Sequence, residues 1–192
     1  MKLHVILASG SPRRRELLSG MGFDFTVADK FAVEEVFPAD MEPRLVPEYL
    51  AGVKSDACPL ALGAGEVLLT ADTVVLLEGE ILGKPRDRRE AIDMLTRMQG
   101  RPHTVVTGVV LRSPVRRVAF SDTTKVWFSP LSPSEIEHYV DTCRPMDKAG
   151  AYGVQEWIGY AAIQRIEGSF YNVMGLPTQK VYVALKEFAS EK

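Results

Sequence analysis

Short apolar runs alternate with amphipathic stretches along the chain, which predicts strands and helices in mixed order. An apolar run at residues 3–8 indicates a buried strand, and residues 11–21 fit a helix that ends before Gly22. Residues 23–29 alternate between apolar and polar positions, as a half-exposed strand does. The acidic stretch at residues 31–43 follows neither period, so we expect irregular backbone there.

Two later helices carry clear start signals. Asp87 is followed three residues later by Glu90, and Ser132 is followed by Glu135, so each pair predicts a capping box. The first of these helices should stop at Gly100. The remaining elements are a weak helix at 47–58, two strands around a turn at 78–79, a hairpin that turns at 113–114, one or two strands in 160–175, and a closing helix at 177–189.

These elements predict an α/β fold with a mixed twisted sheet and surrounding helices. The chain has 192 residues, of which 46% are hydrophobic and 25% charged, so we expect one domain over residues 1–192, with two lobes. The net charge of −2 produces no overall positive potential that would attract nucleic acid, so we expect no specific nucleic-acid partner. No apolar run approaches the roughly 18 residues of a membrane span, and a cytoplasmic protein is expected. Cys58 and Cys143 lack metal-ligand spacing, and two free thiols are favoured over a disulfide.

Three arginines occupy the start of the first helix, where the helix dipole disfavours cations. On a helical wheel Arg14 falls inside the apolar stripe, Arg13 lies near its edge, and Arg15 points to solvent. A buried arginine needs a partner that carries negative charge, and the free N–H groups of a helix start also bind anions. We therefore expect a phosphate chain here, although no Walker lysine motif is present. The alternative to phosphate binding is that the arginines form a solvated face of the helix, and we retain this interpretation for Arg15.

One carboxylate interrupts the apolar run at residues 67–77. Aspartate is depleted in strands, so Asp72 either takes part in the chemistry or is held by structural hydrogen bonds. Burial and a nearby phosphate make a carboxylate hold a proton more tightly, which suits a general base, whereas next to Mg²⁺ it would act as a ligand. Glu34 and Glu35 add hard oxygen ligands for Mg²⁺ or Mn²⁺, and a solvated acidic loop is the alternative.

Further candidates are weaker when each is taken alone. Lys84 follows a strand end and precedes a proline, and Lys54 lies in the weak helix; an ordinary surface position is the alternative for both. Gln155 ends an irregular stretch of small residues, and its amide can donate and accept at once, as recognition of a base edge requires. The histidines lie apart and fit no triad or zinc motif, so we interpret all three as structural: His4, His103 and His138.

Six stretches occur in a fixed order from the first residues to the last helix: "LASGSPRRRELL", "VEE", "ADTVV", "LGKP", "MDKAGAYGVQ" and "YNVMGLP". Together they resemble the Maf family of nucleoside triphosphate pyrophosphatases. The resemblance implies a fold like that of the inosine triphosphate pyrophosphatases, with two lobes around a deep cleft. It also implies hydrolysis of a nucleoside triphosphate to the monophosphate and pyrophosphate, with Mg²⁺ or Mn²⁺ as cofactor.

The resemblance assigns roles to single residues. Asp72 would be the proton acceptor, with Lys84 and Glu35 beside it in catalysis, and Glu35 and Asp72 would hold the metal. The residues that would bind the substrate or select it are Ser9, Arg13, Arg14, Lys54, Thr73, Lys148 and Gln155.

Within the family, "DKAGAYGVQ" looks like the branch that acts on dTTP and UTP. One amide of Gln155 can meet both O4 and N3–H of a 2,4-dioxopyrimidine. Many relatives have glycine after this glutamine, whereas here Glu156 and Trp157 follow and would reshape the rim of the base pocket. The alternatives are the branch that acts on 7-methyl-GTP and a non-catalytic nucleotide-binding regulator of cell division. The oligomeric state is open, with a homodimer as one option.

Overall fold

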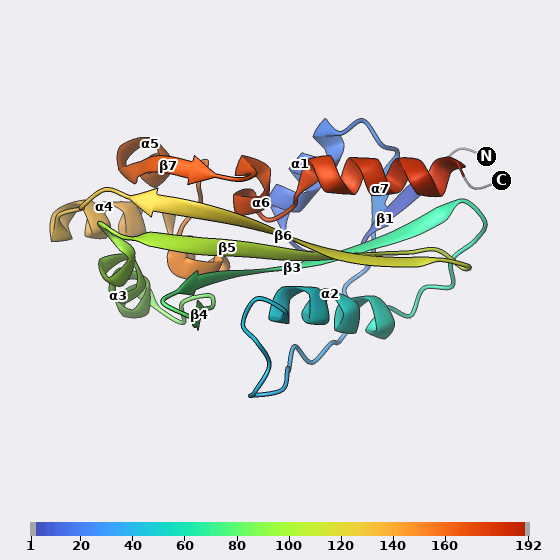
Figure 1. Cartoon of the computed structure of the whole chain (residues 1–192), viewed down its shortest axis with the longest axis horizontal. Coiled ribbons are helices and arrows are strands. Elements are labelled where there is room, and N and C mark those ends of the chain that lie inside the picture. Colours follow the sequence, from blue (N-terminus) through green and yellow to red (C-terminus); the bar gives the residue numbers. More distant parts are fainter. Residues whose placement is uncertain (1–2, 191–192) are drawn as a thin grey trace. The chain divides into compact units, whose positions relative to one another are not determined.

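The computed structural model describes residues 3–190, which divide into two compact units. The first unit comprises residues 3–72, 107–122 and 175–190, and the second comprises residues 73–106 and 123–174. Three long strands contribute to both units: β3 (Glu66–Leu77), β5 (Pro102–Arg112) and β6 (Arg117–Phe128). Figure 1 labels these elements. Two units agree with the two lobes expected from the family, and the deep cleft remains a prediction.

The first unit contains two parallel strand pairs, both formed by β1. Its strand order is β2-β1-β3-β5-β6, and β1 (His4–Leu7) pairs in parallel with both β2 (Phe25–Val27) and β3. Val5 lies opposite Val67 in that ladder, and both side chains are buried. The continuous apolar run predicted for the first strand is therefore confirmed, because β1 is covered on both faces.

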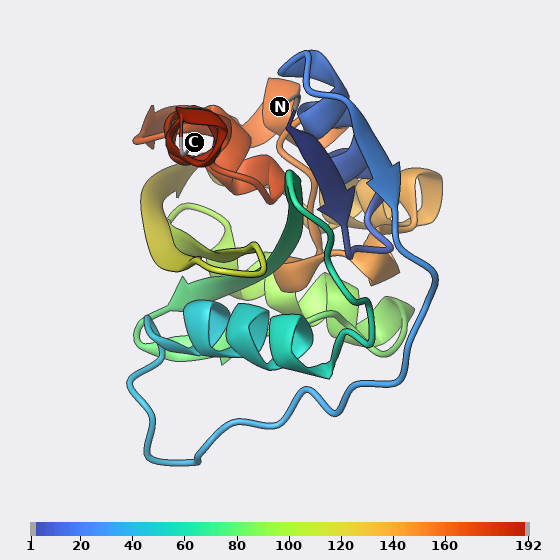
Figure 2. The same ribbon diagram turned by 90° about the vertical axis from the view of Figure 1, so that its right-hand side faces the viewer.

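Two helices cover opposite faces of the first unit's strands, as Figures 1 and 2 show for α2 (Val46–Ala57) and α7 (Thr178–Ser190). Neighbouring residues of β6 reach them in turn: the Ser121 hydroxyl donates to Glu48 on α2 at 2.8 Å, and Asp122 pairs with Lys180 on α7 at 2.7 Å. This alternation is the period of two expected of a strand.

The approach of α2 to the sheet depends on one glycine. A Cβ atom at Gly108 on β5 would lie 2.1 Å from the backbone nitrogen of Glu48. The first unit also contains α1 (Pro12–Gly20), and residues 28–45 form the irregular segment predicted from the sequence. The buried stripe of the closing helix is confirmed as well, at Val181, Leu185 and Phe188.

The second unit has the strand order β4-β3-β5-β6-β7, in which β4 (Glu80–Leu82) pairs antiparallel with β3 and β7 (Ile163–Glu167) pairs antiparallel with β6. Glu78 and Gly79 make the predicted turn with φ angles of 52° and 89°. The unit's helical segments are α3 (Arg88–Met98), α4 (Pro133–Cys143), α5 (Trp157–Ala162), α6 (Phe170–Met174) and the short 3₁₀ turns η1 (Pro145–Asp147) and η2 (Ala149–Ala151).

The two predicted capping boxes differ. The box at the start of α4 is present in full, with Ser132 and Glu135 bonded reciprocally. At α3 the Asp87 side chain accepts from the Glu90 N–H at 2.9 Å. The second bond of the box, from the Asp87 N–H to the Glu90 side chain, is not formed, so that part of the prediction is wrong. The Glu90 carboxylate accepts instead from the backbone and side chain of Arg86, at 2.6 and 2.9 Å, because that residue adds an ion pair to the backbone bond.

Other expectations have clear outcomes within residues 3–190. Residues 160–175 contain one strand, β7, and its flanks are helical in α5 and α6, which the sequence pattern did not indicate. Cys58 and Cys143 are free thiols, as predicted. No helix of the described chain is long and apolar enough to cross a bilayer.

Candidate active site

Asp72 lies on β3 at a point where the backbone is fixed from two sides. The Thr70 hydroxyl donates to the Ala51 carbonyl on α2 at 2.7 Å, and the Arg14 guanidinium donates to the Ala71 carbonyl at 2.8 Å. Because both preceding residues are anchored, the Asp72 side chain leaves the strand from a defined position.

Lys54 brings two of the predicted carboxylates together. Its Nζ atom lies 2.6 Å from Asp72 Oδ1 and 2.9 Å from Glu35 Oε2. The side chains of Lys54 and Asp72 are each 14% exposed, whereas Glu35 is 48% exposed. Lys54 is therefore neither an ordinary surface lysine nor unpaired, and the irregular acidic segment delivers Glu35 to a specific partner.

Only one oxygen of Asp72 is bonded in this cluster. Lys54 contacts Oδ1, and Oδ2 accepts no hydrogen bond from any residue between 3 and 190. A carboxylate that is held at one oxygen and open at the other can accept a proton or bind a cation without releasing its anchor.

The Arg14 guanidinium is bonded within the fold. Its Nε donates to the Gly175 carbonyl at 2.8 Å, and one Nη donates to the Ala71 carbonyl and, at 3.3 Å, to the Ser9 hydroxyl. Burial lowers the Arg14 pKa, and the charge of Asp72 opposes that shift. The wheel correctly placed Arg14 inward. Two carbonyl oxygens and one hydroxyl accept from its Nε and one Nη, so these donors need no anionic ligand.

The start of α1 keeps its predicted cap. The Ser11 hydroxyl accepts from the Arg14 N–H at 3.4 Å, and the Ser9 hydroxyl accepts from the Ser11 N–H at 3.3 Å. Arg13 is half-buried and Arg15 exposed, as the wheel predicted. The predicted residues that lie in the first unit are thus Ser9, Arg13, Arg14, Glu35, Lys54 and Asp72.

The second unit holds the other predicted residues, beginning with Thr73 and Lys84. Thr73 is half-buried on β3, and Lys84 is exposed just after β4. Within residues 3–190 the Lys84 ammonium has no ion-pair or hydrogen-bond partner. The Gly150 N–H donates to the Gly83 carbonyl at 3.0 Å, so the "LGKP" stretch is tied to the "DKAGAYGVQ" stretch.

Lys148 forms a second cluster of one lysine and two carboxylates. Its Nζ lies 3.0 Å from Glu156 Oε1 and 2.7 Å from Asp147 Oδ1, and its side chain is 9% exposed. The other Glu156 oxygen accepts from the Tyr139 hydroxyl, which itself accepts from the Gly153 N–H at 2.9 Å. Burial, followed by the bond to Glu156, raises the Tyr139 pKa, so the phenol keeps its proton.

Tyr139 was not predicted from the sequence as a site residue. Glu156 was predicted only to shape the rim of the base pocket. Tyr139 lies on the apolar face of α4 and is fully buried, so nothing in the pattern separated it from core residues. The signal for Glu156 was its place directly after Gln155, the residue predicted to contact the base.

Gln155 carries a buried polar atom without a partner. Its Oε1 is shielded from solvent and accepts no hydrogen bond from residues 3–190. Most buried polar atoms in proteins are bonded, so this oxygen marks a place where a ligand's donor could bind.

The histidines lie outside both clusters. His103 is buried, its Nε2 lies 2.7 Å from the Tyr152 hydroxyl, and burial lowers its pKa to about 4. His4 Nε2 lies 3.0 Å from the Thr26 hydroxyl, and His138 packs edge-on against Trp157. These contacts agree with the structural interpretation.

The donor set fits a divalent metal that shares its coordination with a substrate. Among residues 3–190 no group of three or more His, Cys, Asp or Glu side chains could hold a metal alone. Glu35 and Asp72 nevertheless approach the same cation, Lys54. Mg²⁺ is commonly bound through one or two carboxylates together with phosphate oxygens of the substrate, so two converging carboxylates suffice.

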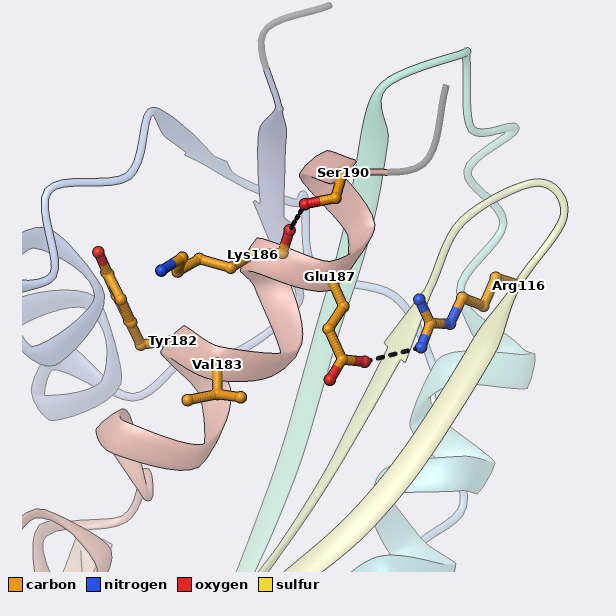
Figure 3. A pocket seen from close by; sticks show the side chains of 6 residues that line it. All are labelled: Arg116, Tyr182, Val183, Lys186, Glu187 and Ser190. Atoms are coloured by element: carbon orange, nitrogen blue, oxygen red, sulfur yellow. Dashed lines mark hydrogen bonds and ion pairs between the residues drawn. The ribbon is translucent and has the colours of Figure 1, made fainter.

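A surface pocket of about 500 Å³ lies along α7 in the first unit, and Figure 3 shows the side chains that line it. None of them is a predicted site residue. Arg116 pairs with Glu187 at 2.9 Å, and its guanidinium lies 4.8 Å from the centre of the Phe188 ring. This cation is therefore already satisfied within the unit.

Comparison with known proteins gives a consistent result over nearly the whole chain. A dTTP/UTP pyrophosphatase of Bacteroides thetaiotaomicron is 50% identical over 186 residues, which cover 97% of this chain and 96% of the relative. A dTTP/UTP pyrophosphatase of Porphyromonas gingivalis is 50% identical over 189 residues, covering 97% and 95%.

A HAM1 protein from Coxiella burnetii has a similar structure, with a TM-score of 0.52 and 14% identity over 96% of this chain and 99% of that one. This likeness concerns the fold alone, and it confirms the expected mixed α/β class. Residues 4–188 match the family described as Maf-like protein. The chain therefore belongs to the Maf family.

Proposed function

We propose that this protein hydrolyses dTTP and UTP to the monophosphate and pyrophosphate, with residues 1–192 acting as one domain. The observation that carries the chemistry is the cluster in which Lys54 holds Asp72 at 2.6 Å and Glu35 at 2.9 Å. The names of the two relatives described above support the choice of pyrimidine nucleotides.

Asp72 is the general base in this proposal. Its Oδ2 takes a proton from a water molecule that attacks the α-phosphorus of the nucleotide. A new bond forms between that water oxygen and phosphorus, the bond from phosphorus to the α,β-bridging oxygen breaks, and pyrophosphate leaves with the bonding electrons. Lys54 fixes the other carboxylate oxygen, so the base keeps its orientation while it gains the proton.

Positive charge and N–H groups bind the phosphates. In the first unit we assign this role to Ser9, Arg13 and the start of α1, with Arg14 holding the backbone that carries Asp72. In the second unit Lys84 offers an exposed ammonium without a described partner. Phosphoryl transfer depends mainly on positioning and charge neutralisation, which such groups provide.

Glu35 would hold Mg²⁺ or Mn²⁺, and Asp72 would share it through the oxygen that does not take the proton. The metal, when bound, supplies positive charge that neutralises the phosphate oxygens. Thr73, Lys148 and Gln155 are assigned to substrate selection, and the unpaired oxygen of Gln155 suits the N3–H donor of uracil or thymine.

The test is an assay of pyrophosphate release by the purified protein with Mg²⁺ or Mn²⁺. The panel contains dTTP, UTP, CTP, GTP and 7-methyl-GTP. Release from dTTP and UTP is the expected result, and it should be lost in Asp72→Asn. Release from 7-methyl-GTP alone would assign the protein to the other branch. Nucleotide binding without release from any member would favour a regulator that binds without catalysis.

A further inference from the structure

The Gly153–Glu156 turn, which carries Gln155, is anchored at both ends to one phenol. The Gly153 N–H donates to the Tyr139 hydroxyl at 2.9 Å, and that hydroxyl donates to a Glu156 carboxylate oxygen. The turn is closed by the Glu156 N–H, which donates to the Gly153 carbonyl at 3.0 Å. Tyr139 is fully buried on α4, so the anchor has little freedom to move.

Lys148 completes the bonding of Glu156. It lies 3.0 Å from the carboxylate oxygen that Tyr139 does not use, and its side chain is 9% exposed. Both oxygens of Glu156 are therefore engaged, one by the phenol and one by a cation that it shares with Asp147. Carboxylates that bridge a buried donor and a cation are rigid, because each bond restricts a different oxygen.

The amide of Gln155 lies in direct reach of this network. A Cβ atom at Gly153 would meet the Gln155 Nε2 at 3.0 Å and the Glu156 Cδ at 2.8 Å, so the amide and the carboxylate cover the same glycine. The Glu156 carboxylate therefore takes up room on the side of the turn where the Gln155 amide lies. Its Oε1 stays buried and has no bond to any described residue.

We infer that Glu156, held by Lys148 and Tyr139, is a positioning residue that sets base selectivity by fixing the amide of Gln155. This inference rests on the proposed function, because it concerns how the pyrimidine is recognised. Glu156 touches neither the reacting phosphorus nor the water in this scheme, so its effect on base selection passes through Gln155. An effect that passed through Lys148 instead would persist when Gln155 is replaced.

The experiment compares kcat/KM for UTP and CTP in the full-length protein. Glu156→Gln and Tyr139→Phe keep the shapes of the side chains but break the network, and we expect each to lower the UTP to CTP ratio about 5- to 10-fold. The effect should fall mainly on KM, with kcat for UTP within about threefold of the wild type. Tyr160→Phe is the matched control and should leave the ratio unchanged, because Tyr160 is 88% exposed and lies outside this network.

A double substitution separates positioning from general damage. If Glu156 acts through Gln155, then Glu156→Gln should not lower the ratio further in a Gln155→Ala background. Additive losses in that background would overturn the inference. An unchanged ratio in both Glu156→Gln and Tyr139→Phe, with a lower ratio in Gln155→Ala, would also overturn it.

Failure of the proposed function has a different signature. A wild-type protein that releases no pyrophosphate from UTP or CTP would overturn the function and the selectivity role together. A wild type that prefers UTP, with a preference that survives both network substitutions, would overturn only this inference. Exchange of the Gly153 amide proton, measured by NMR, should accelerate in Tyr139→Phe, and unchanged exchange would contradict the anchor itself.

Discussion

The two units each contain a lysine between two carboxylates, and the clusters differ in what is left open. Lys54 lies 2.6 and 2.9 Å from its partners, and Lys148 lies 2.7 and 3.0 Å from its own. In each cluster one carboxylate is sheltered and the other is about half exposed. The sheltered Asp72 has one oxygen without a described partner, whereas the sheltered Glu156 uses both.

This difference teaches that an ion pair alone does not mark a catalytic carboxylate. A fully bonded carboxylate such as Glu156 is suited to hold neighbouring groups in place, because any new ligand must displace an existing bond. A partly bonded one such as Asp72 can take a proton while its anchor persists. The two clusters are therefore assigned to positioning and to chemistry.

The largest expected effect is a loss of kcat that distinguishes the carboxylate of the first cluster from that of the second. Asp72→Asn should lower kcat about 10²- to 10⁴-fold, because the amide cannot accept the proton of the attacking water. Glu156→Gln should leave kcat for UTP nearly unchanged. Pyrophosphate release under saturating UTP measures both variants, and equilibrium binding of UTP shows whether Asp72→Asn still binds nucleotide. Similar losses of kcat in the two variants would refute the assignment of different roles.

Acid should destabilise the second unit through His103. Its folded pKa, about 4, lies below the value of 6.5 taken for the exposed side chain, so the unfolded chain binds the proton more readily. Stability from this residue is complete above pH 6.5 and is lost as the pH falls towards 4, at a cost of about 3 kcal/mol.

Urea unfolding at pH 7 and at pH 4 tests this effect by comparing the wild type with His103→Gln. The wild type should lose more stability between the two conditions, since the variant lacks the titrating group. His138→Gln, at an exposed position, is the control and should follow the wild type. Equal pH dependence of the wild type and His103→Gln would contradict the prediction.

The first unit should depend on Arg14 even without nucleotide. Arg14→Met removes the donors to the Gly175 and Ala71 carbonyls, which should lower the free energy of unfolding by about 2 kcal/mol. Arg15→Met, in the next and exposed position, should change it by less than about 0.5 kcal/mol. Chemical unfolding in the absence of ligand compares the pair. Equal stability of the two variants would show that these carbonyl bonds contribute nothing.

The smallest effect contrasts two lysines of the second unit, Lys84 and Lys148, which the family resemblance assigned to catalysis and to substrate binding. Lys84→Met should leave the melting temperature unchanged and raise KM for UTP about tenfold, because its ammonium is exposed and has no described partner. Lys148→Met should instead lower the melting temperature by several degrees, since Glu156 loses its counter-charge. Thermal melts and initial-rate kinetics distinguish the two, and a stable Lys148→Met would argue against a positioning role.

Most of the fold could be predicted because local periodicity decides it. The apolar runs of β1 and β3, the caps of α1 and α4, and the stripe of α7 are each set by residues close together in the chain. The flanks of β7 could not be predicted, since α5 and α6 span six and five residues, too few for a clear helical period. The capping box of α3 was predicted only in part, because the Glu90 carboxylate accepts from Arg86 and not from the Asp87 N–H.

For the candidate site, the sequence alone determined which residue types are present and in what order, and it separated Arg14 from Arg15 by the helical wheel. The tertiary structure decided their partners. It carried Glu35 and Lys54 to Asp72 from an irregular segment and a helix, gave Arg14 carbonyl acceptors, and bonded Tyr139 to Glu156. Spacing along a chain fixes a face of a helix or strand, but the bonds that hold a side chain come from elements far apart in sequence, and only packing brings those together.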